Sequence, residues 1–234
     1  MDPLKRLFDV VASVLGLIVT GPVLLFVTFL VWVKDRHSPF YISQRVGRSG
    51  QLFKMVKLRS MVIGADLKGG SSTSNDDPRI TSIGHVIRRY KLDELTQLWN
   101  VIVGDMSLVG PRPQVQAGVD MYTVLERDLL SVRPGITDFA SIVFADEGAI
   151  LAAHHDSDAA YDQLIRPGKS RLGLFYIENR SLYLDFCLIW LTLLTIISRE
   201  DALHGVVKLL QKLNAPSDLI RLASRQEPLI LNRH

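Results

Sequence analysis

The chain has 234 residues, of which 47% are hydrophobic and 22% are charged, enough for a domain with its own core; this composition excludes an intrinsically disordered protein. The formal net charge of +3 suits anionic lipids, nucleotides or pyrophosphate, and the lack of an arginine-rich tract disfavours nucleic acid. The lone cysteine, Cys187, excludes an intrachain disulfide and a cysteine-based zinc site, and the mean hydropathy of +0.19 points to membrane contact.

The N-terminal segment predicts a helix in the membrane. Val10 to Val33 contains no charged residue, and a helix of roughly two dozen residues is about 36 Å long, enough to cross a hydrocarbon core of about 30 Å. Gly21 and Pro22 at the midpoint predict a break, since proline removes a backbone donor and clashes with the preceding turn. Basic residues flank both ends of the run, which favours the cytoplasmic side for both. The residues alone leave a kinked transmembrane helix and a re-entrant hairpin open.

The chain then changes to a β-rich pattern. Two β-rich runs between Ser38 and Arg59 are separated by Gly47-Arg48-Ser49-Gly50, which predicts a β-hairpin with a glycine-containing turn. Lys57 and Arg59 at its end fit a solvated basic face as well as a strand that binds phosphate groups.

The stretch from Lys91 to Pro113 holds the main candidate site. Apolar residues recur there at three- and four-residue spacing, which predicts a helix that ends at Gly104. Asp93 and Glu94 lie near the start of this helix, where acidic residues also occur for ordinary helix-start reasons. Adjacent helical residues point about 100° apart, so the two carboxylates would need different roles.

Two arginines accompany the acidic pair. Arg112 stands between two prolines, which fix the backbone on both sides of its guanidinium. Arg88 lies about one and a half turns before Asp93, in a predicted helix whose N-cap is Thr81 or Ser82.

The C-terminal half predicts helices and carries one weaker metal pattern. His154 and His155 are interpreted as surface residues, because no histidine follows at the helical spacing that zinc sites use. The predicted elements are a polar amphipathic helix over 114–131, a short apolar helix over 183–197 in the core or at a membrane interface, and a basic amphipathic helix over 202–213 of the kind that lies on a membrane.

The stretch LDELTQLWNVIVGDMSLVGPRP, with FKMVKLRSM before it and RPGIT after it, resembles the signature of the bacterial sugar transferases, the monotopic polyprenyl-phosphate phosphoglycosyl transferases. The resemblance extends over roughly residues 3 to 185. It departs from the family pattern at Asp138, where the family commonly has glycine, and this departure concerns sugar recognition more than chemistry.

The resemblance implies a reaction in which a UDP-sugar gives its phosphosugar to polyprenyl (undecaprenyl) phosphate, with UMP as the second product. It implies Asp93 as nucleophile through a covalent phosphosugar intermediate, and Glu94 as a ligand of Mg²⁺ or as the residue that acts on the lipid phosphate. Asp93 and Glu94 are then the metal ligands. The residues expected to bind substrate phosphates are Arg88, Arg112, Lys57 and Arg59.

We therefore expect a mostly helical α+β protein of the monotopic membrane class, with a re-entrant helix over 1–36, a catalytic domain over 37–200, and a C-terminal amphipathic helix and tail over 201–234. It would lie on the cytoplasmic face of a bacterial inner membrane, in contact with lipids but not with nucleic acid, and a homodimer is left open. The alternatives are a nucleotide-sugar hydrolase and a non-catalytic adaptor at the membrane surface.

Overall fold

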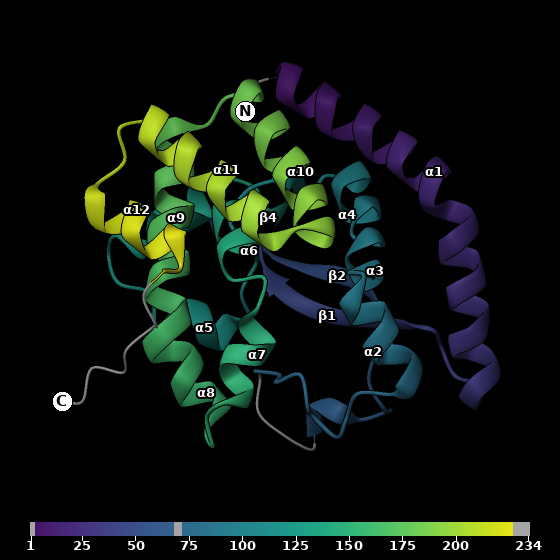
Figure 1. Ribbon diagram of the computed structural model, residues 1–234. Coiled ribbons are helices and arrows are strands. Elements are labelled where there is room, and N and C mark those ends of the chain that lie inside the picture. Colours follow the sequence, from purple (N-terminus) through teal and green to yellow (C-terminus); the bar gives the residue numbers. More distant parts are fainter. Residues whose placement is uncertain (1–2, 68–71, 227–234) are drawn as a thin grey trace. The chain divides into compact units, whose positions relative to one another are not determined.

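The computed structural model describes residues 3–67 and 72–226, and this part of the chain is mostly helical with two small sheets (Figure 1). The predicted α+β class is therefore confirmed. The chain divides into two compact units, each built from several segments. Unit 1 comprises Met1–Ala65, Pro78–Leu108 and Pro113–Ile136, and unit 2 comprises Asp66–Asp77, Val109–Arg112 and Thr137–His234. The predicted division into three consecutive functional segments stays a prediction.

The first element, α1, is one long helix over Pro3–Asp35. It continues through Gly21 and Pro22, and its ribbon bends near the middle without folding back on itself (Figure 1). Pro22 cannot donate a hydrogen bond to the preceding turn, and Thr20 Oγ1 donates to Gly16 O at 2.7 Å, a bond that also favours bending. The expected break is thus a bend in a continuous helix, and the re-entrant hairpin is not confirmed. By length and composition α1 could cross a membrane.

The N-terminal end of α1 is fastened to unit 1 by charged side chains. The Arg6 guanidinium donates to Val101 O at 2.6 Å and to Ile102 O at 2.9 Å. Asp9 is 1% exposed and accepts hydrogen bonds from Ser107 Oγ at 2.8 Å and Leu108 N at 3.3 Å. Buried charges need such partners, so this end of α1 is held in one position.

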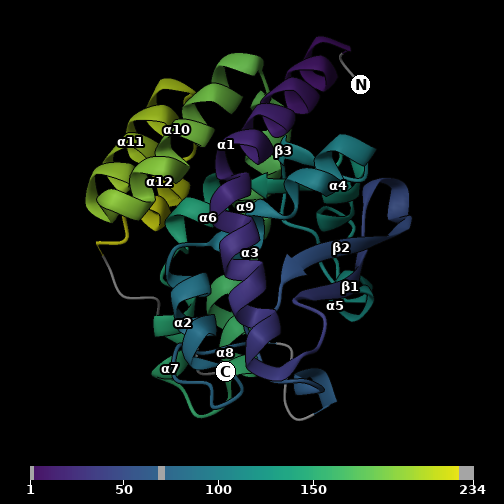
Figure 2. The same ribbon diagram turned by 90° about the vertical axis from the view of Figure 1, so that its right-hand side faces the viewer.

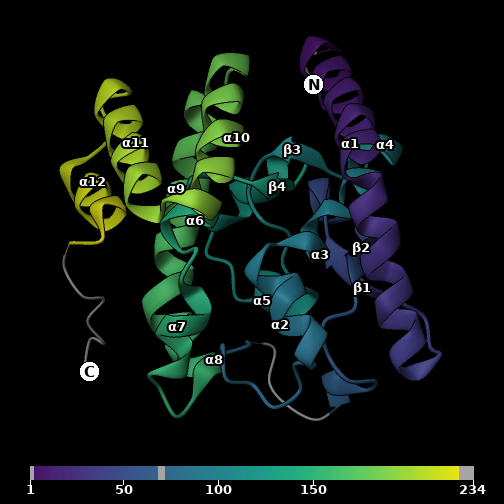
Figure 3. The same cartoon turned by 45° about the vertical axis from the view of Figure 1, so that its right-hand side comes forward.

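The remainder of α1 packs along the helices of the same unit, as Figures 2 and 3 show. Leu24 and Val31 form a buried apolar cluster with Leu58 and Ile87. Many apolar side chains on the opposite face of α1 are exposed, Ile18, Leu25 and Phe26 among them. One face of α1 therefore packs in the core of unit 1, and the opposite face exposes apolar side chains that suit an apolar environment outside the protein.

A β-hairpin follows, as predicted. Strands β1, Phe40–Val46, and β2, Leu52–Leu58, pair antiparallel with Phe40 opposite Leu58 and Val46 opposite Leu52. The 3-10 turn η1, Arg48–Gly50, joins them, with positive φ at Ser49 and Gly50.

Three short helices complete the part of unit 1 that bears the site. They are α2, Ser82–Arg89, α3, Leu92–Leu95, and α4, Leu98–Val103. Thr81 caps α2 by accepting from Gly84 N at 3.0 Å, which confirms one of the two cap candidates. Gly104 ends α4 with φ 105°, as predicted. The predicted continuous helix is wrong in one respect, because a turn separates α3 from α4.

The helix predicted over 114–131 is also wrong. The structure has α5, Gln116–Asp120, and the 3-10 helix η3, Glu126–Ser131. Between them Thr123 N donates to Glu126 Oε2 at 2.9 Å and Glu126 N donates to Thr123 Oγ1 at 3.2 Å. This reciprocal capping starts a new helical turn and so ends the first one.

Strands β3, Ser107–Val109, and β4, Gly135–Thr137, form the second small sheet. Most of unit 2 is helical. Its elements are α6, Phe139–Val143, α7, Glu147–Ala152, α8, Ser157–Ala160, the π-helical turn η4, Tyr161–Ile165, α9, Arg166–Asn179, α10, Leu182–Ile197, α11, Arg199–Lys212, and α12, Ser217–Ser224.

Helices α10 and α11 lie side by side (Figures 1 and 2). One face of α10 is buried through Leu184, Leu188 and Leu191, whereas an apolar face that includes Trp190 is exposed. Lys212 lies 4.6 Å from the centre of the Tyr183 ring at the edge of that face. The predicted apolar and basic amphipathic helices are therefore both present.

Candidate active site

The site in unit 1 is centred on Asp93 in α3 and Lys57 in β2. Lys57 Nζ lies 4.0 Å from Asp93 Oδ2, and the two side chains are only 18% and 14% exposed. A lysine at this distance places a positive charge beside the carboxylate and offers it to an anionic substrate. Glu94 follows Asp93 in the first turn of α3 and is partly buried.

The position of α3 relative to β2 is set by two buried polar side chains. Thr96 Oγ1 donates to Val56 O at 3.0 Å and also to Asp93 O at 2.9 Å. Asn100 accepts from Val56 N at 3.0 Å and donates to Lys54 O at 2.7 Å. These side chains bond backbone groups of β2 that its partner strand does not use, and they thereby hold Asp93 beside Lys57.

Sequence reasoning missed Thr96 and Asn100. A signal was present, because the two polar residues are four positions apart and so share one face of the predicted helix, three and seven positions after Asp93. Gln97 is a further case: it is fully buried, and its amide atoms have no hydrogen-bond partner among the described residues.

Arg88 lies in the last turn of α2, which packs against α3. Its side chain is partly buried, and within residues 3–67 and 72–226 its guanidinium forms no hydrogen bond or ion pair. It is thus an arginine near the acidic pair with donors to offer a ligand.

Arg59 has different surroundings. Its Nη1 and Nη2 bind the Asp35 carboxylate at 2.5 and 2.7 Å, and its Nε donates to Ser38 O at 2.8 Å. The structure therefore pairs Arg59 with Asp35 at the end of α1 through three of its five N–H donors, and its role as a phosphate ligand stays a prediction.

Arg112 belongs to unit 2, and its approach to Asp93 stays a prediction. Within unit 2 the segment before Arg112 is held by Gly110 N, which donates to Thr137 O at 2.9 Å.

Asp138, 2% exposed, caps α6 by accepting from Ser141 N at 2.7 Å and Ser141 Oγ at 2.8 Å. Burial raises the pKa of Asp138, against the hydrogen bonds of Ser141 and the charges of Lys169 and Arg112.

The carboxylates of Asp93 and Glu94 fit Mg²⁺ when substrate phosphates supply further ligands. No group of three or more histidine, cysteine or carboxylate side chains gathers in the described part of the chain. Asp93 and Glu94 supply two carboxylates, and Mg²⁺ is commonly held by one or two carboxylates together with substrate phosphates. These residues would therefore hold Mg²⁺ only jointly with a bound substrate.

Residues 1–199 match the family model described as bacterial sugar transferase. The chain belongs to this family. It is 33% identical over 204 residues to the exopolysaccharide production protein ExoY of Sinorhizobium fredii, an alignment that covers 81% of this chain and 83% of the relative.

Two other relatives are longer. The chain is 37% identical over 196 residues to undecaprenyl-phosphate glucose phosphotransferase of Komagataeibacter xylinus, covering 81% of this chain and 35% of the relative. It is 32% identical over 214 residues to undecaprenyl-phosphate galactose phosphotransferase of Salmonella typhimurium, covering 85% of this chain and 41% of the relative. The chain thus spans less than half the length of these two sugar transferases.

Proposed function

We propose that the protein is a phosphoglycosyl transferase that moves a phosphosugar from a UDP-sugar to undecaprenyl phosphate. The observation that carries the proposal is the half-buried pair of Asp93 and Lys57, at 4.0 Å, in a member of the sugar transferase family. The names of the relatives support the acceptor and the transfer of a phosphorylated sugar.

In the first step, a carboxylate oxygen of Asp93 attacks the β-phosphorus of the UDP-sugar. The bond from this phosphorus to the bridging oxygen breaks, and UMP leaves with the electron pair. An aspartate is ionised at neutral pH and needs no general base. The phosphosugar remains on Asp93 as an acyl phosphate, which divides one difficult transfer into two easier steps.

In the second step, an oxygen of undecaprenyl phosphate attacks the same phosphorus, and the Asp93 carboxylate is released. Attack of an anion on an anion requires positive charge near the phosphates. Lys57, Arg88 and Arg112 would provide it, and Arg112 is suited to bidentate phosphate binding. Mg²⁺, when bound by Asp93 and Glu94, would supply further neutralisation of phosphate charge.

The lipid acceptor requires a site at the membrane, and the docking of α1 supports a monotopic arrangement. Arg6 and Asp9 near one end of α1 and Asp35 at the other end bond to the same unit. A helix that crossed the bilayer would carry its ends to opposite faces and lose one of these sets of bonds. We therefore place α1 as a re-entrant helix and unit 1 on the cytoplasmic face of the inner membrane.

A transfer assay tests the proposal. The purified chain with Mg²⁺ would be given UDP-glucose, UDP-galactose or UDP-N-acetylgalactosamine, with and without undecaprenyl phosphate, and UMP would be measured. We expect sustained UMP release only with the lipid. Asp120→Asn, which removes an exposed carboxylate in α5, is the matched control and should behave as wild type. Equal UMP release without lipid would instead indicate a hydrolase, and no release with any donor would contradict the proposal.

A further inference from the structure

The end of α1 is tied to the catalytic elements by a bidentate ion pair. Arg59 immediately follows β2, and its side chain is 11% exposed. Its Nη1 and Nη2 bind both oxygens of Asp35, and its Nε donates to Ser38 O. A bidentate arginine–carboxylate pair fixes both distance and orientation, so few positions of α1 relative to β2 keep all three bonds.

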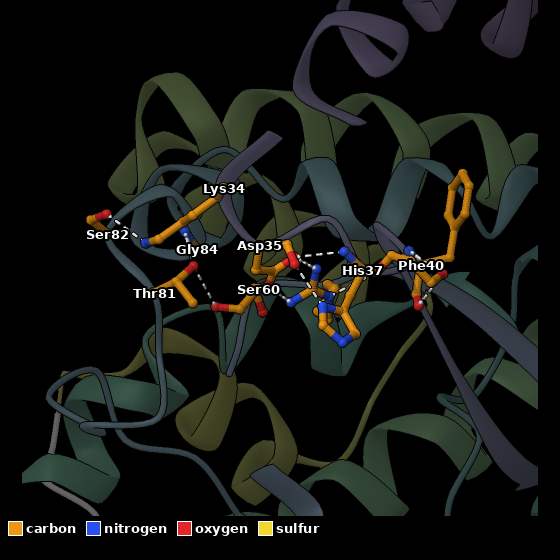
Figure 4. Close-up of polar contacts among 10 residues, drawn as sticks. Lys34, Asp35, His37, Phe40, Ser60, Thr81, Ser82 and Gly84 are labelled. Carbon is orange, nitrogen blue, oxygen red and sulfur yellow. Dashed lines mark hydrogen bonds and ion pairs between the residues drawn. The ribbon is translucent and has the colours of Figure 1, made fainter. Parts of the chain in front are cut away.

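The same end of α1 is shaped to present Asp35. Arg36 has φ 59° and donates its N–H to Trp32 O at 2.7 Å, which ends the helix directly after Asp35. Asp35 Oδ1 also accepts from His37 N at 3.1 Å (Figure 4). The neighbouring Lys34 donates to Ser82 Oγ at 3.1 Å, and Ser82 is the first residue of α2.

The segment that follows Arg59 continues this connection into α2. Ser60 O accepts from Thr81 N at 3.0 Å and from Thr81 Oγ1 at 3.3 Å (Figure 4). A Cβ on Gly84 would lie 1.8 Å from Ser60 O, so the first turn of α2 lies directly against this carbonyl. The end of α1, the end of β2 and the start of α2 thus form one bonded group.

These elements carry the residues of the site. Lys57 lies two positions before Arg59, and β2 ends between them at Leu58, while Arg88 lies in the last turn of α2. A displacement of the α1 end would therefore move Lys57 and Arg88 relative to Asp93. Misplacement of catalytic groups by about 1 Å can cost about 100-fold in rate.

We propose that Asp35 and Arg59 form a positioning pair, which locks the end of the membrane helix α1 to β2 and α2, and that Arg59 acts through this pair rather than by contact with substrate phosphate. The proposal rests on the proposed transferase function. Under this proposal the activity depends on Asp35, although Asp35 is neither a nucleophile nor a metal ligand.

The test compares Asp35→Asn, Arg59→Gln and the double variant in the full-length protein. Transfer to undecaprenyl phosphate is measured with the UDP-sugar that wild type uses, and the thermal midpoint Tm is measured in parallel. Both single variants should lower kcat by about 10- to 100-fold and leave KM for the UDP-sugar unchanged. The double variant should be no worse than the more impaired single variant in kcat or in Tm, because each single variant already breaks the same Asp35–Arg59 ion pair.

The matched control is Arg171→Gln, which breaks an exposed arginine–aspartate pair with Asp218 in unit 2; it should retain wild-type activity. A raised KM for the UDP-sugar in Arg59→Gln, with normal activity in Asp35→Asn, would overturn the proposal and restore Arg59 as a phosphate ligand. If wild type transfers nothing, the proposed function fails, and the Tm values of the three variants still decide whether the pair acts as a unit. Additive losses of Tm in the double variant would then overturn the proposal that Asp35 and Arg59 act as one pair.

Discussion

The close approach of Gly84 to Ser60 gives a sharp prediction for Gly84→Ala. The new Cβ would lie 1.8 Å from Ser60 O and 2.9 Å from Thr81 Oγ1, whereas real Cβ contacts essentially never fall below 3.0 Å. Ser60 O is backbone, so the strand end and the helix must separate by more than an ångström. Overpacking typically costs about 1–3 kcal/mol. In a protein of this size each kcal/mol lowers Tm by about 2–4 °C, so a loss at the upper end corresponds to roughly 6–12 °C.

The matched control is Gly118→Ala in α5. Its nearest neighbours would lie at 3.5 Å, an ordinary contact, and alanine gains up to about 1 kcal/mol over glycine in a helix. Thermal unfolding in detergent and the transfer assay would be run on both variants. We expect Gly118→Ala to match or exceed wild-type stability, and Gly84→Ala to lose both stability and activity. Equal Tm and equal activity for the two variants would refute the reasoning about this contact.

Two predictions concern other buried polar groups. Because burial raises the pKa of Asp138 above its ordinary value of 3.8, stability falls as the pH rises from about 3.8 through the raised pKa. Asp138→Asn keeps a capping side chain and removes this ionisation, so its Tm should exceed wild type at pH 7 and approach wild type near pH 4; a pH-independent difference would contradict this. Asn100→Leu leaves Val56 N and Lys54 O without their partner and should cost about 1–3 kcal/mol for each such group. The equally buried Gln97→Met removes amide atoms that have no partner among the described residues, and urea unfolding should show it to be neutral or stabilising; a large loss in Gln97→Met would show that this amide is satisfied in solution.

Features that depend on neighbouring residues could be predicted from the sequence. The cap at Thr81, the glycine turn of the hairpin and the end of α4 at Gly104 each follow from a few adjacent side chains. The reciprocal capping of Thr123 and Glu126 is equally local. The polar amphipathic pattern over 114–131 predicts one continuous helix, and this prediction misses the capping pair.

Partners distant in sequence could not be predicted. Asp35 and Arg59 are 24 positions apart, and Asp9 lies 98 positions from Ser107. Nothing local distinguishes an arginine that binds a carboxylate from one that binds phosphate, which is why Arg59 was expected at the substrate. The fold brings the end of α1 to the end of β2 and so pairs Arg59 with Asp35, while phosphate binding by Arg59 stays a prediction.

The measurement that tests the central claim most directly is the intact mass of the purified protein. The protein would be incubated with Mg²⁺ and each UDP-sugar in the absence of lipid acceptor, and Asp93→Asn would be treated in the same way. We predict a mass gain of one phosphosugar in wild type with the correct donor, and none in Asp93→Asn. An unmodified wild-type protein that still transfers once undecaprenyl phosphate is added, or the same adduct in Asp93→Asn, would contradict the assignment of Asp93 as nucleophile.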